Sequence, residues 1–195
     1  MISVIMPSYL GDYKRAAKNR ESKIRRAVES VFSQTISVEL VVIADGCQKT
    51  VDLLNKYYEG RFNGYMIRKQ PVWSGVPRNT GILKAMNDIV CYLDTDDWIE
   101  TGHCEKIVNN FRGDWVWFND RIWHSGWLSR KCDVNRRGLS GTSNIAHKKI
   151  ALWPERATYA HDWIFIESLK RASKDFHFIG DGGYMVCHIP GRYDI

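Results

Sequence analysis

The apolar run from Ile89 to Leu93 is followed directly by three carboxylates, Asp94, Asp96 and Asp97. β-Branched residues inside the run and charges on both sides of it predict a buried strand. In open α/β sheets, ligands bind beyond the carboxyl ends of the strands. Three acids this close repel one another unless a cation neutralises them, which favours a hard divalent ion such as Mg²⁺ or Mn²⁺. A solvated acidic turn is the alternative.

Short apolar runs alternate with helical patterns along the first 119 residues. Strands are expected at 2–6, 39–44, 64–69, 89–93 and 114–119, and helices at 22–34, 50–59, 75–86 and 102–111. This alternation predicts a Rossmann-like α/β fold in which helices cover both faces of a mostly parallel sheet. Pro7 is expected to end the first strand, and residues 120–160 are less regular. Because the chain contains no repeat or linker, residues 1–195 are expected to form a single domain.

Composition limits the expected cellular compartment and the expected kind of binding partner. A formal charge of +6 favours an anionic partner. No apolar run approaches the length needed to span a bilayer, and the N-terminus lacks the pattern of a signal peptide, so a cytoplasmic location is expected. The five cysteines form no CxxC pair, which favours reduced, mostly buried thiols.

Residues that could contact a ligand stand at three of the predicted strand ends. They are Pro7, Ser8 and Tyr9 after the first strand, Asp45 after the second, and Asp94, Thr95 and Asp96 after the central one. Parallel strands bring these ends to one edge of the sheet, where they can line a cleft. Asp45 can accept from a base imide N–H, Tyr9 can stack on a base, and a metal at Asp96 can bridge phosphates. Together they fit a nucleoside diphosphate, although Asp45-Gly46 alone is typical of a turn.

Four segments carry a family resemblance: Ile2–Tyr9, Val41–Gly46, Gly75–Ile82 and Tyr92–Trp98. In order and spacing they resemble the motifs of family 2 glycosyltransferases with the GT-A (nucleotide-diphospho-sugar transferase) fold. The resemblance implies a donor half at 1–98 and an acceptor and catalytic half at 99–195. It also implies a metal-dependent, inverting transfer of a sugar from a UDP-sugar to an acceptor hydroxyl on a glycan, glycoprotein or glycolipid.

Specific positions follow from the same resemblance. It implies that the UDP-sugar contacts Pro7, Ser8, Tyr9, Asp45, Arg78, Asp94, Thr95 and Asp96. Asp94 and Asp96 then form the DxD motif, with Asp96 nearest the metal and Asp94 a possible second ligand. The guanidinium of Arg78 suits a phosphate or a carboxylate that holds it in place, but a surface arginine at a helix start is the alternative.

The C-terminal half resembles the family more loosely. In the segment Ala160–Glu167, His161 stands where the family usually has Glu, and Asp162 is the candidate general base. Its alternative is an N-cap or first-turn aspartate facing the helix dipole. The segment Cys187–Tyr193 resembles the family's C-terminal segment, so His188 is either a metal ligand or a buried structural histidine. A histidine ligand favours Mn²⁺, with Mg²⁺ possible.

Two other classes of protein are alternatives to a glycosyltransferase. A sugar-phosphate nucleotidyltransferase would favour a Gly-rich loop after the first strand, and the loop here is poor in glycine. A nucleic-acid-binding module would explain the charge but not three acids at a strand end, so no nucleic acid is expected. The stretch Gly138–Asn144 is expected to be flexible, and Trp115, Trp117, Trp123 and Trp127 either stack on sugars or fill the core. The sequence does not predict the sugar, the acceptor or the oligomeric state.

Overall fold

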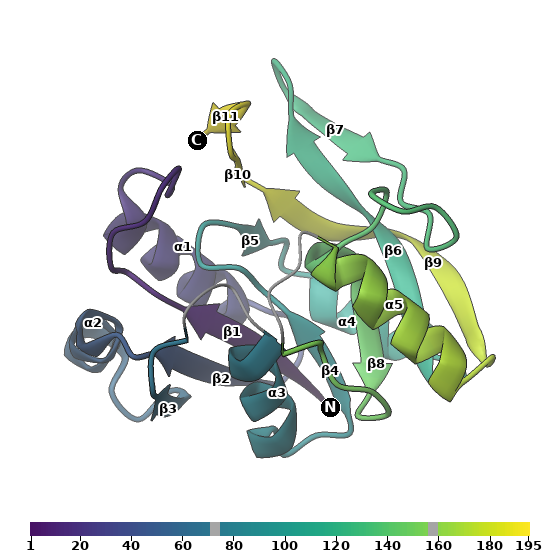
Figure 1. Cartoon of the computed structure of the whole chain (residues 1–195), viewed down its shortest axis with the longest axis horizontal. Coiled ribbons are helices and arrows are strands. Elements are labelled where there is room, and N and C mark those ends of the chain that lie inside the picture. Colours follow the sequence, from purple (N-terminus) through teal and green to yellow (C-terminus); the bar gives the residue numbers. More distant parts are fainter. Residues whose placement is uncertain (71–74, 156–159) are drawn as a thin grey trace.

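The computed structural model describes residues 1–70, 75–155 and 160–195. Within these residues the chain forms a nine-stranded mixed sheet of order β3-β2-β1-β4-β8-β6-β9-β5, with β7 paired to β6 and a separate β10-β11 hairpin (Figure 1). The α/β fold with helices on both faces of a mostly parallel sheet is therefore confirmed, and the antiparallel pairs all involve strands of the second half.

The first half contains four parallel strands and three helices. The strands are β1 (Ile2–Ser8), β2 (Val38–Asp45), β3 (Asn63–Ile67) and β4 (Ile89–Tyr92); the helices are α1 (Arg20–Phe32), α2 (Gln48–Tyr58) and α3 (Gly75–Lys84). All of these elements were predicted, to within a few residues at each end. The register aligns Ser8 with Ala44 and Ala44 with Met66, so the carboxyl ends of β1, β2 and β3 lie at one edge.

Pro7 does not end β1, contrary to the prediction, because β1 continues to Ser8. Ile5 directs its carbonyl toward β4, where it accepts from the Leu93 N–H at 3.0 Å. Residues two apart in a strand direct their backbone groups toward the same neighbouring strand, so the backbone nitrogen of Pro7 also points toward β4. The pairing with β4 has ended at Tyr92, opposite Ile5, and the N–H that proline lacks has no ladder partner to lose.

The second half is built from strands that pair with partners distant in sequence. Its elements are β5 (Trp98–Ile99), α4 (His103–Asn110), β6 (Trp115–Trp123), β7 (Trp127–Arg130), the 3₁₀ turn η1 (Thr142–Asn144), β8 (Ile145–Lys148), α5 (His161–Ala172), β9 (Phe176–Val186), β10 (His188–Ile189) and β11 (Tyr193–Asp194). β8 runs antiparallel to both β4 and β6, whereas β9 is parallel to β6. Therefore β6 and β9 point the same way as β4, and their carboxyl ends reach the same edge.

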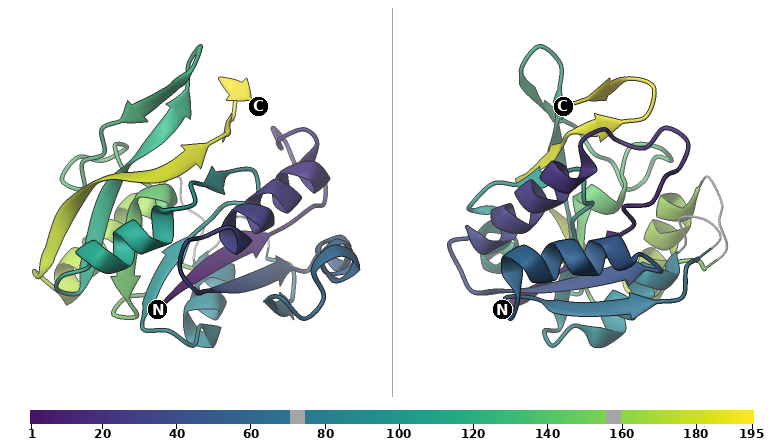
Figure 2. Two further views of the ribbon diagram at one scale, coloured as in Figure 1. Left: turned by 180° about the vertical axis from the view of Figure 1, so that it is seen from behind. Right: turned by 90° about the vertical axis from the view of Figure 1, so that its left-hand side faces the viewer.

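Two hydrophobic cores lie on opposite faces of this sheet. Alternate residues of β1 separate between them, since Val4 and Met6 face the helices α1, α2 and α4, while Ile5 faces α3 and α5. Figures 1 and 2 show these two layers of helices from opposite sides. The C-terminus lies beside the β1–α1 connection, far from the N-terminus.

The aromatic side chains divide between the core and the surface, whereas the cysteines are all buried. Trp115 is fully buried, but Trp123 is 37% exposed at the end of β6, so the core explains only part of the tryptophan supply. All five cysteines are free and buried, which confirms the prediction of buried thiols. No helix among the described residues is long and apolar enough to cross a membrane.

Candidate active site

The acidic residues after β4 lie in two different environments. Asp97 is 5% exposed and accepts from the Cys187 N–H at 2.7 Å and from the Tyr184 hydroxyl at 3.0 Å. Burial raises the pKa of the Asp97 carboxyl well above its usual range. Asp97 therefore fixes the end of β9 against β4, and Asp94 and Asp96 are left to face the edge of the sheet.

The environment of Asp96 disfavours the ionised form of its carboxyl. Burial, and secondly the neighbouring charge of Asp94, raise the pKa of Asp96 to about 6. The backbone carbonyl of Asp96 accepts from the Arg26 guanidinium at 2.9 Å, which fixes the turn. Two half-buried carboxylates whose charges disfavour each other form a donor set that fits a hard divalent cation.

Arg78 joins α3 to this acidic pair. Its guanidinium donates to Asp94 Oδ1 at 3.1 Å, and its side chain is only 10% exposed. The guanidinium carbon also lies 4.8 Å from the centroid of the Trp153 ring. A surface arginine at a helix start is therefore the wrong interpretation, because Arg78 is buried and paired with Asp94.

Asp45 ends β2 as a nearly buried carboxylate. It accepts from the Gln70 N–H at 2.7 Å and from Lys69 Nζ at 3.1 Å. Lys69 Nζ also lies 4.2 Å from the centroid of the Tyr9 ring, so one lysine bridges the two residues predicted to hold a nucleoside. The structure thus brings Tyr9 and Asp45 together, as the strand ends predicted.

The other predicted donor contacts differ in how much of each side chain is available. Ser8 is 2% exposed, and its hydroxyl is hydrogen-bonded to that of Thr50 at 2.9 Å, so the side chain is satisfied within the protein. Pro7 and Thr95 are half-buried. These three positions remain predictions.

His188 lies in the C-terminal hairpin beside the β1–α1 connection. Its Nε2 atom is 3.1 Å from the Arg15 carbonyl oxygen, and its Nδ1 atom is 3.2 Å from Asp194 Oδ1. Lys23 is ion-paired with the same Asp194 oxygen. His188 lies close enough to Asp96 for a positive charge on its ring to lower the pKa of Asp96. Even so, no group of three or more His, Cys, Asp or Glu residues among those described is arranged to hold a metal.

Asp162 stands in the first turn of α5, at the same edge of the sheet. The N-cap of α5 is Ala160, so the N-cap interpretation of Asp162 is wrong, while its first-turn position is confirmed. Asp162 Oδ1 accepts from the Thr142 hydroxyl at 3.0 Å and lies 3.3 Å from His161 Nε2. The side chain is 35% exposed, so a ligand can approach the carboxylate.

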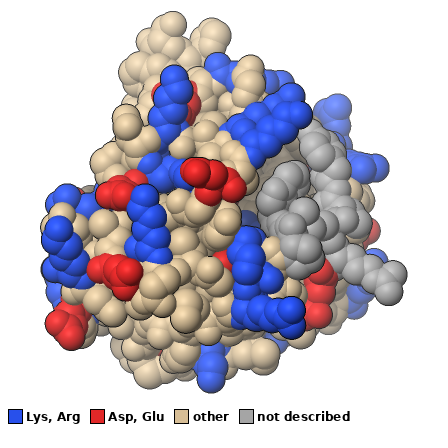
Figure 3. Space-filling view, turned by 60° about the vertical axis from the view of Figure 1, so that its left-hand side comes forward, with Lys and Arg blue, Asp and Glu red and all other residues tan. Residues whose placement is uncertain are grey.

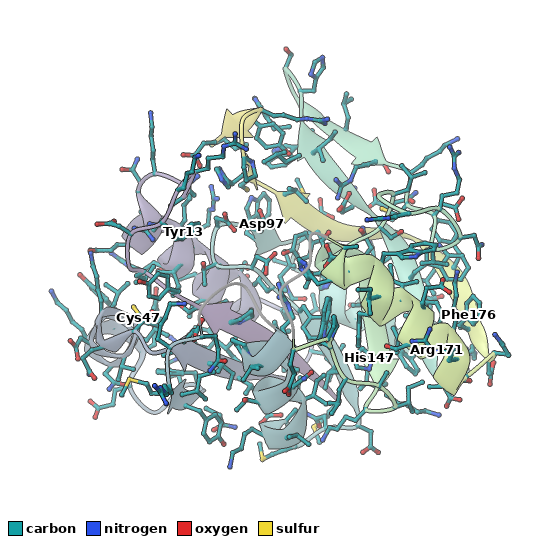
Figure 4. All side chains as sticks on the ribbon, viewed as in Figure 1. Tyr13, Cys47, Asp97, His147, Arg171 and Phe176 are labelled. Atoms are coloured by element: carbon teal, nitrogen blue, oxygen red, sulfur yellow. The ribbon has the colours of Figure 1, made fainter. Side chains whose placement is uncertain are left out.

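Several residues of the site carried no signal in the sequence. Tyr13 lies on the same side of the molecule as Asp97 (Figure 4). Tyr13 is 47% exposed, and the burial of the rest of the side chain, and secondly the charge of Asp96, raise the pKa of its phenol. Lys69, Thr142 and Asp194 also reach the site only through contacts with residues far away in the chain. The aromatic residues of the β1–α1 connection were the one available hint, since a loop that leads from a strand end has access to the cleft.

The fold and the acid-bearing strand ends define the GT-A class of glycosyltransferase structures. The crystal structure of residues 1–349 of TarS from S. aureus in complex with UDP-GlcNAc superposes with a TM-score of 0.72 at 18% identity, covering 98% of this chain and 60% of that one. A mannosyltransferase from Pyrobaculum calidifontis in complex with GDP-Man and Mn²⁺ superposes with a TM-score of 0.63 at 13% identity, covering 98% of this chain and 58% of that one. Likeness at these identities concerns the fold alone.

Sequence similarity identifies the family. The profile of glycosyl transferase family 2 matches residues 3–118, and the chain belongs to this family. The putative glycosyltransferase EpsH of Bacillus subtilis (strain 168) is 32% identical over 97 residues, covering 48% of this chain and 28% of EpsH. The poly(ribitol-phosphate) β-N-acetylglucosaminyltransferase TarP of Staphylococcus aureus (strain N315) is 31% identical over 113 residues, covering 55% and 32%. The chain thus spans less than a third of the length of either relative.

Proposed function

We propose that this chain transfers a sugar from a UDP-sugar to an acceptor hydroxyl with inversion at the anomeric carbon, and that it requires a divalent metal. The observation that carries the proposal is the acidic pair at the end of β4. Asp96 is half-buried with a pKa raised to about 6, and Asp94 beside it is held by Arg78. Such a pair is costly for a surface turn but suits a metal-bound diphosphate.

The nucleoside part of the donor fits the ends of β1 and β2. Asp45 presents a carboxylate that accepts from a base imide, and Tyr9 presents a ring beside it. Lys69, which now bridges both, neutralises Asp45 until a base takes over the contact. Selection of uracil over guanine and adenine is therefore expected to depend on Asp45.

The metal would be held by Asp96 and His188, with Asp94 as a possible third ligand. Mn²⁺ suits this mixed set of oxygen and nitrogen donors better than Mg²⁺. When bound, such an ion supplies positive charge to the diphosphate leaving group. His188 has to exchange its contact with Asp194 for the metal, and Lys23 remains to hold Asp194.

The chemical step needs one base and no enzymic nucleophile. Asp162 takes the proton of the acceptor hydroxyl as that oxygen attacks the anomeric carbon. The bond between the anomeric carbon and the diphosphate oxygen breaks on the opposite face, so the configuration inverts. Arg78 holds Asp94 in place during this displacement.

Two other functions fit the residues less well. A sugar-phosphate nucleotidyltransferase conflicts with membership of glycosyl transferase family 2. A nucleic-acid-binding module calls for one continuous basic surface. On the face drawn in Figure 3, acidic side chains instead lie among many of the lysines and arginines. Arg121, Arg130 and Lys148 are each paired with an acid as well.

The proposal is tested by screening nucleotide sugars for release of the nucleoside diphosphate. UDP-GlcNAc is the first donor to try, because it is the ligand named for TarS and its sugar is the one named for TarP. We expect turnover of a UDP-sugar with Mn²⁺ and its loss with EDTA. Binding of fluorescent DNA in preference to UDP would contradict the proposal and favour the nucleic-acid-binding module.

A further inference from the structure

The turn that precedes β8 is fixed from beneath by buried polar groups. Asp120, which is fully buried in β6, accepts from the Ser143 hydroxyl at 2.8 Å. Asn144 is also fully buried; it donates to the Phe118 carbonyl at 3.1 Å and accepts from the Gly141 N–H at 3.0 Å. The stretch expected to be flexible therefore ends in a rigid turn at residues 141–144.

This turn presents Thr142 to the candidate base. Thr142 is 7% exposed, and its hydroxyl donates to Asp162 Oδ1 at 3.0 Å. His161 Nε2 lies 3.3 Å from the same oxygen. The second oxygen, Oδ2, makes no hydrogen bond to any described residue and faces Gly141, where a β-carbon would lie 3.6 Å away. Among the described residues, one oxygen of the carboxylate is thus held, while the other has no hydrogen-bond donor and can take a proton.

The geometry points to Thr142 as a positioning residue that orients the Asp162 carboxylate for proton transfer, an inference that rests on the proposed function of Asp162. A base whose orientation is set by a third group is preorganised for the transition state. The Ser143–Asp120 bond holds the turn, and Arg130 neutralises the buried Asp120. In this inference Thr142 acts only through its hydrogen bond to Asp162.

The test compares five variants of the full chain in UDP release from UDP-GlcNAc with Mn²⁺, in which water takes the place of the acceptor hydroxyl. If the screen identifies a faster donor, that donor replaces UDP-GlcNAc. Thr142→Val removes the hydroxyl with little change of shape, and Thr142→Ser keeps it. Thr35→Val is the matched control, because Thr35 donates to the Glu105 carboxylate at 2.8 Å in an exposed position away from the site. Asp162→Asn and the double variant Asp162→Asn/Thr142→Val complete the set.

We expect Thr142→Val to lower kcat by roughly 10–100-fold, the scale of a misplaced catalytic group, with UDP affinity unchanged. Thr142→Ser and Thr35→Val should retain nearly full turnover. In the Asp162→Asn background, Thr142→Val should cause no further loss, since a residue that acts through Asp162 has nothing left to orient. Urea unfolding of each variant separates a loss of fold from a loss of rate.

The possible results distinguish the positioning role of Thr142 from the proposed role of Asp162 as the base. Wild-type turnover of Thr142→Val, with Asp162→Asn impaired, overturns the positioning inference and leaves the proposed base intact. Equal losses from Thr142→Val in both backgrounds, or a loss of UDP affinity, would show that Thr142 only stabilises the structure. Normal turnover of Asp162→Asn, or a wild-type chain that uses no nucleotide sugar, contradicts the proposed function itself and the inference with it.

Discussion

The two halves of the sheet build their parts of the site in different ways. Between Met1 and Trp98 the site residues stand directly at the ends of parallel strands or, as with Arg78, in the helix that leads into one. Beyond Trp98 the candidate base is placed by a relay of side chains, from Asp120 through the turn at 142–144 to Asp162. In the proposed function, the first half thus supplies the binding edge from local structure, and the second half supplies the base through tertiary contacts.

The largest expected effect is a loss of turnover with UDP binding retained. Asp162→Asn should lower kcat by roughly 10²–10⁴, because the base acts only in the transition state, and should leave UDP affinity nearly intact. Steady-state kinetics together with calorimetry of UDP check both parts. An Asp162→Asn protein with normal turnover would rule out Asp162 as the base, and Glu167 would be tested next.

The next largest expected effect is a loss of UDP binding at the first half of the sheet. Asp96→Ala should weaken Mn²⁺-dependent UDP binding by about 10–100-fold or more, while the chain stays folded, because a hard ligand is removed from the phosphate site. Calorimetric titration with and without Mn²⁺ measures this loss. Unchanged affinity and unchanged dependence on Mn²⁺ would show that the acidic pair is not a metal site.

A smaller effect concerns the base of the donor. Asp45→Ala should weaken UDP binding by about 1–3 kcal/mol, the cost of a lost charged hydrogen bond whose partner is left unpaired. The measurement compares UDP with GDP and ADP for the wild-type chain and for the variant. A wild-type chain that binds the three nucleotides equally well does not use Asp45 to recognise uracil.

The smallest expected effect is on stability, because the ionised carboxylate of Asp96 lowers the free energy of unfolding. The folded pKa of Asp96, about 6, lies above the value of about 4 expected in the unfolded chain, so the folded state binds the proton more tightly. Stability contributed by the protonated form is therefore lost as the pH rises from about 4 to 6. Asp96→Asn should raise the free energy of unfolding by about 1–2 kcal/mol at pH 8 and hardly at all at pH 4. Urea unfolding at both pH values checks the sign, and a destabilised variant at pH 8 would contradict it.

The sequence was sufficient for the first half because its rules are local. Asp45 and Asp94 each follow an apolar run, and parallel pairing alone brings such ends together. Pro7 was the exception, since its tolerance in a central strand depends on where β4 stops pairing.

The second half could not be predicted in the same way. Asp162 was found by resemblance, but its bond to Thr142 joins two segments that meet only when β8 pairs with β4. The contact of His188 with Arg15 spans 173 residues of chain. Periodicity and turn signals contain no information on such contacts, because they depend on the packing of the whole sheet.

The central claim is that the ends of β1, β2 and β4 form a UDP-sugar site, and a crystal structure with UDP and Mn²⁺ tests it most directly. We expect the uracil beside Asp45 and Tyr9, and an anomalous manganese peak at Asp96, with the diphosphate between them. UDP bound away from this edge, or manganese bound without an Asp94 or Asp96 ligand, would contradict the account.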